Sequence, residues 1–319
     1  MKFIVEVNSV TKSYGDVVAV SDVSFRIPQG DIMGFLGPNG SGKTTSIKML
    51  LGLTKPQTGQ ISVLGANPFT NRRFKFDVGY VPETDCFYRW ITAFDFLENY
   101  ARFQLPREQS RKRAIEILEE IGLRDVANKK ILEFSKGMKQ RIKLGQALIH
   151  KPSFIIADEP FNGLDPIVRK QFFDLMIKYS EDYQTTWFVS SHVLFEVERL
   201  AKNIILLYKG RTIAQGSPSR IRAMIQEQPH SIQITSPVTR DLVKLLVDQS
   251  EFNDIVSSLE FDNRPTEFKQ DLSFTIETKN PVRLYQLLTD LVVDNNIPIS
   301  EIKPTDEGLE ALFKTLTVG

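Results

Sequence analysis

The sequence is short of the features that would place a chain in a membrane, in an oxidising compartment or along a nucleic acid. Its 319 residues include one cysteine, Cys86, so no intramolecular disulfide can form and a reducing compartment is expected. Lys and Arg number 40 against 39 Asp and Glu, and a net charge of +1 argues against holding nucleic acid by bulk positive charge. No run approaches the roughly 18 consecutive apolar residues that a membrane span needs.

What is present is the composition of a globular protein, with 41% hydrophobic and 25% charged residues. The length predicts about two domains. The first residues alternate like a strand, and Glu6 comes too early for a secretory signal. We therefore expect a cytosolic protein that is not processed.

Strand patterns alternate with helical patterns over the first two thirds of the chain. Residues 32–36 and 154–157 are continuous apolar runs, typical of strands covered on both faces of a sheet. Between residues 92 and 149 the pattern becomes helical, and Thr92 with Asp95 resembles a capping box. Further expected elements are a helix over 166–179, a strand over 186–190, a helix over 193–201 and a hairpin of 204–208 with 212–214. This order predicts an α/β domain with a largely parallel sheet.

The character of the chain changes after Gln228, and we place a domain boundary there, between residues 1–228 and 229–319. The second part alternates strand patterns near 232–234, 272–276 and 297–302 with helical patterns, and Asn280 is expected to open one helix. A last helix would carry Leu309, Leu312, Phe313 and Leu316. The second domain is predicted to be a small α+β domain.

The strongest local motif follows the apolar run 32–36. It matches the eight-position P-loop pattern and consists of Gly37, Pro38, Asn39, Gly40, Ser41, Gly42, Lys43 and Thr44, with a helical stretch beginning at Thr45. Glycines let successive backbone N–H groups and the helix N-terminus face phosphate oxygens. Lys43 would meet the β- and γ-phosphates, and the Thr44 hydroxyl would bind Mg²⁺.

Two acidic residues end the apolar run 154–157. Asp158 would hold Mg²⁺, directly or through water, and Glu159 would polarise the water that attacks the γ-phosphate. The alternative is an acidic strand end that only caps the next helix.

The motifs follow one another in an order that resembles the nucleotide-binding subunit of an ABC transporter, over about residues 3–216. Beyond the P-loop (Walker A), the likeness rests on Ser135-Lys136-Gly137-Met138-Lys139-Gln140-Arg141 as the signature motif, Asp158-Glu159-Pro160 as the end of Walker B, Gly163-Leu164-Asp165 as the D-loop, Ser190-Ser191-His192 as the H-loop, and Tyr14. The resemblance implies an ABC-type P-loop NTPase fold with a RecA-like core, a β-rich N-terminal part and a helical insert at about 85–150, beside the small α+β domain. The implied cofactors are ATP and Mg²⁺.

In this family two subunits meet head to tail, so that Ser135 and the N–H of Gly137 would contact the γ-phosphate bound by the partner. The usual signature reads Leu-Ser-Gly-Gly-Gln, and this chain keeps its Ser and its second Gly. An ordinary helix N-cap at Ser135 is the alternative.

The other positions that the resemblance assigns are Tyr14, Glu83 and His192. Tyr14 would stack on adenine, unless it is a buried residue at a strand end. His192 would hydrogen-bond the γ-phosphate and help to align Glu159 and the water. Glu83 stands where the family usually has a Gln that touches Mg²⁺; its carboxylate could still offer an oxygen, or it is a surface acid. His150 lacks such a context and is expected at the surface.

The resemblance implies an ATPase that drives a separate integral membrane permease, in an export-type system. The subunit would lie at the cytoplasmic face of the cell membrane, paired with a second copy or with another ATPase subunit, and would select no substrate itself. Relatives that act on ribosomes or DNA, and phosphotransferases with a P-loop, are the alternative classes. The single P-loop and the absence of sustained heptads weigh against the ribosome or DNA class, and the signature with His192 weighs against the phosphotransferase.

Overall fold

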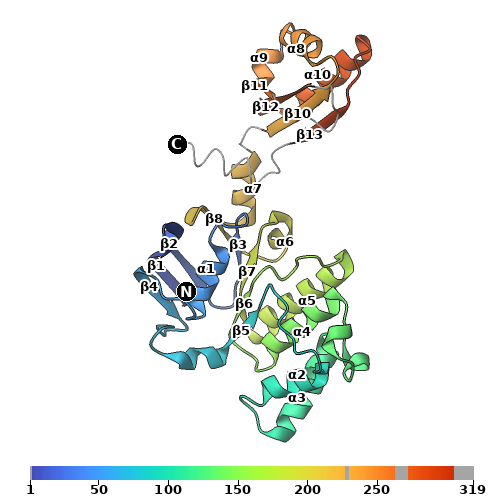
Figure 1. The fold of residues 1–319 in the computed structure, drawn as a ribbon. Coiled ribbons are helices and arrows are strands. Elements are labelled where there is room, and N and C mark those ends of the chain that lie inside the picture. The colour runs from blue at the N-terminus through green and yellow to red at the C-terminus, as the bar shows by residue number, and fades with distance from the viewer. Residues whose placement is uncertain (1, 227–229, 263–271, 305–319) are drawn as a thin grey trace. The chain divides into compact units, whose positions relative to one another are not determined.

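Figure 1 shows a computed structural model of the chain, whose described residues are 2–226, 230–262 and 272–304. The chain forms two compact units, Met1–Pro218 and Ser219–Gly319. The boundary predicted after Gln228 falls within residues 227–229, which lie outside the described residues. Within the described ranges, no helix is long and apolar enough to cross a membrane.

A six-stranded sheet forms the centre of the first unit and confirms the predicted α/β class. All its strands run parallel except the last, which forms a hairpin with its neighbour. In spatial order they are β5 (Val78–Val81), β6 (Phe154–Ala157), β7 (Thr186–Ser191), β3 (Ile32–Leu36), β8 (Asn203–Tyr208) and β9 (Arg211–Gly216). Every residue of β3 and β6 is buried, which explains their continuous apolar sequences.

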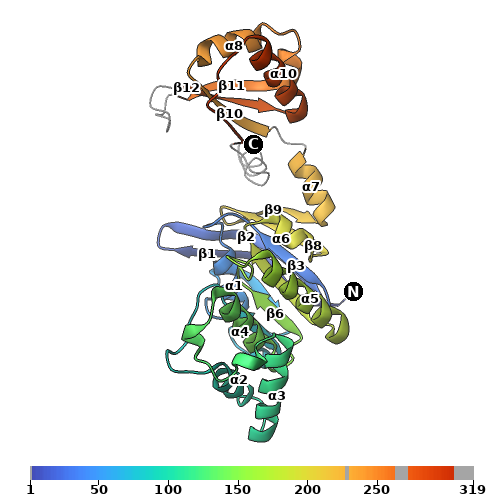
Figure 2. The same ribbon diagram turned by 90° about the vertical axis from the view of Figure 1, so that its right-hand side faces the viewer.

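The central sheet has a separate hydrophobic core on each face, because successive side chains of a strand point to opposite sides. On one face Phe35, Ile156 and Phe188 pack with the apolar residues of a three-stranded antiparallel sheet. That sheet has the order β2 (Val17–Pro28), β1 (Phe3–Tyr14), β4 (Thr58–Val63) and is the β-rich N-terminal part expected from the resemblance. Figure 2 shows β1 and β2 on one side of β3 and a long helix, α5 (Pro166–Tyr183), on the other.

The other face packs against helices. Besides α5, these are α2 (Ala93–Ala101), α3 (Arg107–Glu120) and α4 (Lys136–Leu148). The first unit also contains α1 (Lys43–Leu50), whose apolar residues lie in the core on the side of the antiparallel sheet, and the short α6 (Leu194–Glu198). Thr92 caps α2, as predicted, because its hydroxyl oxygen accepts a hydrogen bond from Asp95 N at 3.1 Å. The helix expected over 193–201 is α6, which is shorter than predicted.

A buried arginine joins the helical region to α5. Arg113 donates from Nε to the carbonyl of Ile149 and from Nη2 to the carbonyl of Leu148, at 2.9 and 3.1 Å, so it satisfies the end of α4. Its Nη1 pairs with Glu120, which also accepts a hydrogen bond from the Tyr179 hydroxyl of α5. Burial, together with Glu120, raises the pKa of Tyr179, which keeps this hydroxyl a donor.

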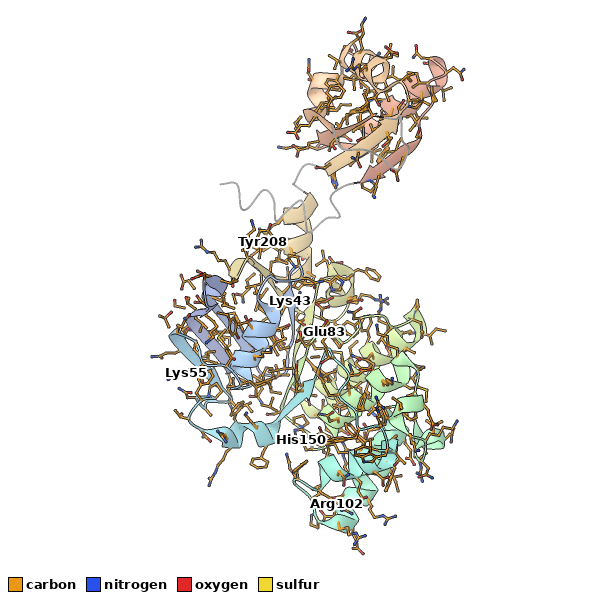
Figure 3. All side chains as sticks on the ribbon, in the orientation of Figure 1. Lys43, Lys55, Glu83, Arg102, His150 and Tyr208 are labelled. Carbon is orange, nitrogen blue, oxygen red and sulfur yellow. The ribbon has the colours of Figure 1, made fainter. Side chains whose placement is uncertain are left out.

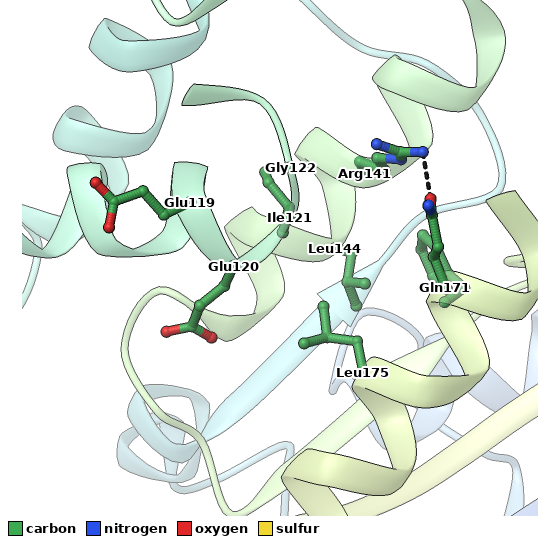
Figure 4. A pocket seen from close by; sticks show the side chains of 9 residues that line it. Glu119, Glu120, Ile121, Gly122, Arg141, Leu144, Gln171 and Leu175 are labelled. Carbon is green, nitrogen blue, oxygen red and sulfur yellow. Dashed lines mark hydrogen bonds between the residues drawn. The ribbon is translucent and has the colours of Figure 1, made fainter. Parts of the chain in front are cut away.

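A pocket of about 190 Å³ opens beside this junction, between the end of α3, α4 and α5 (Figure 4). Leu144, Phe172 and Leu175 are among the residues that line it, and Arg141 of α4 donates a hydrogen bond to Gln171 of α5. None of the residues with a predicted nucleotide role lines it.

The second unit has its own core beneath a four-stranded antiparallel sheet. Its elements are α7 (Pro218–Gln226, which begins at the end of the first unit), β10 (His230–Ser236), α8 (Thr239–Val247), α9 (Phe252–Ile255), β11 (Val256–Asp262), β12 (Leu272–Thr278), α10 (Pro281–Asp294) and β13 (Glu301–Pro304). From β10 onward the chain follows the β-α-β-β-α-β order of a split βαβ unit, with the spatial order β11-β12-β10-β13. The predicted small α+β domain is therefore confirmed.

Two details of this unit differ from the sequence prediction. The strand expected over 297–302 is β13, which begins only at Glu301, because Ile297 and Ile299 pack on the core before the ladder starts. β11 was not predicted, since its sequence mixes serine and acidic residues with few apolar ones. The final helix with Leu309, Leu312, Phe313 and Leu316 lies outside the described residues.

The core of the second unit provides a stability test. Phe274 of β12 is fully buried, and we expect Phe274→Ala to destabilise this unit by about 3–5 kcal/mol through lost burial and a cavity. Scanning calorimetry of the full chain should show the transition of the second unit at a lower temperature and that of the first unit unchanged. The control is Phe261→Ala on the neighbouring strand, where the ring is 51% exposed. Equal losses for the two variants would contradict this account of the core.

Candidate functional site

The P-loop connects the end of β3 to the first turn of α1, where it was expected. Gly37 and Gly42 are required there, because a Cβ would lie 2.2 Å from the carbonyl oxygen of Leu207 in the first case and 2.3 Å from that of Ala19 in the second. Gly42 also has φ +105°, a conformation that favours glycine. It is the N-cap of α1 and provides no side-chain cap, so the first N–H groups of the helix are left for an anion.

The ammonium group of Lys43 is buried among oxygen atoms. Its Nζ lies 2.6 Å from the carbonyl oxygen of Gly37, 3.3 Å from that of Pro38 and 3.2 Å from Glu159 Oε1. The Lys43 and Glu159 side chains are 6% and 7% exposed, so this ion pair is little screened by water. The structure thus brings the P-loop lysine and the second acidic residue of the 158–159 pair together.

Three neighbouring strands end beside the contact between Lys43 and Glu159. The order β6-β7-β3 places the carboxyl ends of these parallel strands side by side, and each end carries one predicted motif. β3 leads to the P-loop, β6 to Asp158 and Glu159, and β7 to His192. His192 Nδ1 lies 2.9 Å from Glu159 Oε2, so the histidine predicted to align Glu159 does contact it.

Glu159 itself has a strained backbone. Its φ is +46°, which is uncommon for a residue with a side chain, and the following Pro160 disfavours helical conformations at this position still further. Such conformations cost about 1–3 kcal/mol and persist where the surrounding structure imposes them, often at functional sites. Among the described residues, the buried Oε1 of Glu159 has no hydrogen-bond donor, although it pairs with Lys43 by charge. This oxygen is available to accept a proton.

Oxygen atoms gather around Asp158. Its carboxylate accepts a hydrogen bond from the Ser190 hydroxyl at 2.6 Å, and the Thr44 hydroxyl is close enough to lower the pKa of Asp158. Burial raises the pKa of Asp158, the Ser190 hydrogen bond opposes this, and the charges of Glu83 and Glu159 add to it.

Tyr80 of β5 provides a second sign that Glu83 and Asp158 lie close together, since burial and then these two charges raise the pKa of Tyr80 to about 12. Figure 3 labels Lys43 and Glu83 in this part of the first unit. Glu83 is exposed, whereas Asp158 is buried.

The described residues contain no group of three or more His, Cys, Asp or Glu side chains arranged to hold a metal by themselves. Thr44, Asp158 and Glu83 offer hard oxygen ligands, the kind that Mg²⁺ accepts. Mg²⁺ is commonly bound by one or two carboxylates together with substrate phosphates, and these residues fit that mode.

The remaining predicted positions lie on separate elements. Tyr14 is 48% exposed at the β1–β2 hairpin, so the buried alternative is wrong, and the Lys12 ammonium lies 5.3 Å from its ring centre. The same hairpin carries Ala19, whose carbonyl touches Gly42 of the P-loop.

The signature residues stand at the start of α4, where Ser135 is the N-cap and accepts a hydrogen bond from Met138 N at 3.3 Å. Gly137 follows in the first turn, and Ser135 and its neighbour Lys136 are exposed. Ser135 therefore caps α4, which is the alternative considered from the sequence, and its contact with a phosphate bound by a partner stays a prediction.

Two sequence expectations need revision. His150 is half-buried and not at the surface: its Nε2 lies 3.2 Å from the carbonyl oxygen of Val78, and burial lowers the pKa of His150.

Ser190 was given no role of its own in the sequence prediction. Its hydroxyl donates to Asp158 and also accepts a hydrogen bond from Glu159 N at 2.9 Å. Its place in the strand before His192 was the only signal in the sequence.

Comparison with known proteins assigns the family. A family model described as "ABC transporter" matches residues 20–162. The bacitracin transport ATP-binding protein BcrA of Bacillus licheniformis is 34% identical over an alignment of 321 residues, covering 100% of this chain and 99% of BcrA. The chain belongs to the ABC transporter ATP-binding proteins. The ABC transporter ATP-binding protein YcbN of Bacillus subtilis is 37% identical over 239 residues, 74% of this chain and 76% of YcbN.

A solved ABC cassette extends the comparison to structure. The dimeric ATP-binding cassette MJ0796, in a post-hydrolysis state with ADP and Pi, matches with 27% identity and a TM-score of 0.63, over 67% of this chain and 98% of that one. This chain is the ATP-binding subunit of an ABC transporter, and it is an ATPase. The MJ0796 cassette is a dimer in that structure.

Ser190 provides a test of how the site is held. We expect Ser190→Ala to lower the ATPase rate about tenfold, the factor that corresponds to about 1.4 kcal/mol, because Asp158 and Glu159 N both lose a buried hydrogen bond. The rate is measured as phosphate release by the full chain. The matched control is Ser180→Ala on α5, which removes a hydrogen bond from Ser180 to the carbonyl of Gly30 and should leave the rate unchanged. A Ser190→Ala rate within twofold of the unchanged protein would contradict the positioning role.

Proposed function

We propose that Lys43, Glu159 and His192 form the γ-phosphate end of the nucleotide site, where ATP is bound by the P-loop and cleaved by water. The observation that carries this proposal is the buried contact of Glu159 with Lys43 on one carboxylate oxygen and with His192 on the other. A carboxylate held in this way lies next to the cation that would bind the phosphate. Phosphate oxygens compete with the Glu159 carboxylate for the Lys43 ammonium. Nucleotide binding therefore breaks the ion pair and leaves the Glu159 carboxylate free to act on water.

Glu159 then acts as the general base. Its Oε1 receives no hydrogen bond from the described residues, so it can accept a proton from the attacking water. His192, with a side chain 43% exposed, contacts the other oxygen and can reach both this carboxylate and solvent. It therefore keeps the carboxylate oriented and can donate a hydrogen bond to the γ-phosphate.

Thr44 and Asp158 would hold Mg²⁺ beside the phosphates, with Glu83 as the third oxygen donor from the chain. The ion would supply positive charge that stabilises the β- and γ-phosphate oxygens. The influence of the Thr44 hydroxyl on the pKa of Asp158 supports this assignment, because it indicates that two hard oxygens from different elements lie near each other. Glu83 adds a negative charge in place of the neutral amide usual in the family, and so favours the cation more strongly.

Tyr14, Ser135 and Gly137 would complete the site in a head-to-tail homodimer. The exposed ring of Tyr14, on the hairpin that touches the P-loop, is suited to stacking on adenine. Ser135 and Gly137 lie at the N-terminus of a 13-residue helix, where N–H groups and the helix dipole favour an anion brought by the partner. Each ATP would thus lie between the P-loop of one protomer and the signature of the other.

The partner would be a separate membrane permease, and the complex an exporter at the cytoplasmic face of the cell membrane. Exposed aromatic rings on and beside the helical region support a docking surface for this partner; they are Tyr88, Trp90 and Phe103, each 66–75% exposed. The likeness to BcrA along its whole length supports transport over a role on ribosomes or DNA. Bacitracin is the first compound to test, in cells that carry the subunit with its neighbouring permease.

The variant Glu159→Gln tests the catalytic assignment. It removes the base but keeps the size of the side chain, and we expect the rate of hydrolysis to fall by about 10²-fold or more while ATP still binds. Because the γ-phosphate then persists, the ATP-bound dimer should accumulate, as measured by size-exclusion chromatography with light scattering.

Glu181→Gln, an exposed exchange near the end of α5, is the matched control and should hydrolyse ATP like the unchanged chain. Hydrolysis by Glu159→Gln at the normal rate would exclude Glu159 as the base. A hydrolysis defect without a lasting dimer would instead count against the proposed homodimer.

A further inference from the structure

A buried lysine lies outside every motif discussed so far. Lys143, in the middle of α4, has a side chain only 2% exposed. Lysine is almost never fully buried unless it is paired, because removing an ammonium from water is costly. The three donors of this ammonium meet three oxygens, the carbonyls of Pro82 and Glu83 and Oδ1 of Asp85, each at 3.0 Å.

These partners belong to the segment that follows β5. It leads from the central sheet into the helical region, and it carries Glu83, the acidic residue near Asp158. Two consecutive carbonyls bound to one ammonium fix the peptide planes on either side of the Glu83 Cα. The direction of the Glu83 Cα–Cβ bond, from which its side chain starts, is then fixed as well, although the residue itself is exposed.

Gln140 stands one turn earlier on the same face of α4. Its Nε2 donates to the carbonyl of Pro160 at 2.6 Å, directly after Glu159. One face of the signature helix therefore binds both segments that carry the carboxylates, Gln140 the one after β6 and Lys143 the one after β5.

We propose that Lys143 is a positioning residue of the ATPase: it holds the main chain at Pro82 and Glu83 so that the Glu83 carboxylate stays beside Asp158, and Asp85 balances its charge. The inference rests on the proposed function, in which Glu83 helps to hold the divalent cation. Lys143 touches neither nucleotide nor cation and acts only through Glu83. It also ties the Glu83 segment to α4, the helix that begins at the signature serine.

The test measures cation binding without turnover. The full chain is titrated with Mn²⁺ in the presence of a non-hydrolysable ATP analogue, and free Mn²⁺ is followed by electron paramagnetic resonance. Lys143→Met should weaken Mn²⁺ binding about tenfold, as expected when a charge-assisted hydrogen bond that positions a ligand is lost. Lys112→Met, at an exposed lysine of α3 outside every motif, is the control and should bind Mn²⁺ as the unchanged chain does.

A double-mutant cycle separates positioning from a general structural effect. Glu83→Ala alone should weaken Mn²⁺ binding, and adding Lys143→Met should weaken it no further, because the side chain that Lys143 positions is gone. If the double variant instead lost Mn²⁺ affinity by the product of the two single losses, the inference would be overturned. Normal Mn²⁺ binding by Lys143→Met would overturn it as well. Normal binding by Glu83→Ala would instead remove Glu83 from the proposed function.

A less invasive variant covers the case in which Lys143→Met does not fold. Asp85 has a side chain 43% exposed, so Asp85→Asn should leave the fold intact while it removes the carboxylate partner of Lys143. We expect weaker Mn²⁺ binding and faster hydrogen exchange of the amides of residues 83–86. Unchanged exchange and unchanged Mn²⁺ binding in Asp85→Asn would contradict the positioning role.

Discussion

The buried ion pair between Lys43 and Glu159 is the contact on which the organisation of the site depends. Two charges removed from water are tolerated only when each has partners, and both are below 10% exposed here. The Gly37 and Pro38 carbonyls complete the environment of Lys43, and His192 completes that of Glu159. Elements from three adjacent strands must therefore meet at one point, and the parallel order β6-β7-β3 makes this possible.

The motifs with local signals could be predicted from the sequence. The P-loop and the pair Asp158-Glu159 each combine a short pattern with an adjacent apolar run, so chemistry and position were predicted together. The parallel sheet followed from the alternation of such runs with helices, and Thr92 at the start of α2 followed from capping chemistry.

Contacts between distant segments could not be predicted in this way. Lys143 meets residues about 60 positions earlier in the chain, and Ser190 meets Asp158 32 positions earlier, with no pattern in the sequence to link them. Strand β11 was missed for a related reason. It is an edge strand, and its polar residues Ser258 and Glu260 face away from the core, so its apolar signal is weak.

The backbone of Glu159 has a consequence for how stability and activity are related in this chain. A left-handed backbone conformation before proline raises the free energy of the folded chain for any residue with a Cβ, and much less for glycine. Glycine at this position would relax the backbone and would also remove the charge that Lys43 compensates. Removing one partner of a buried ion pair costs about 3–5 kcal/mol, more than the roughly 1–3 kcal/mol of backbone strain that glycine would recover. The Lys43 pair therefore keeps a carboxylate at position 159 in spite of its backbone, so the side chain proposed as the base is also the one that stability retains.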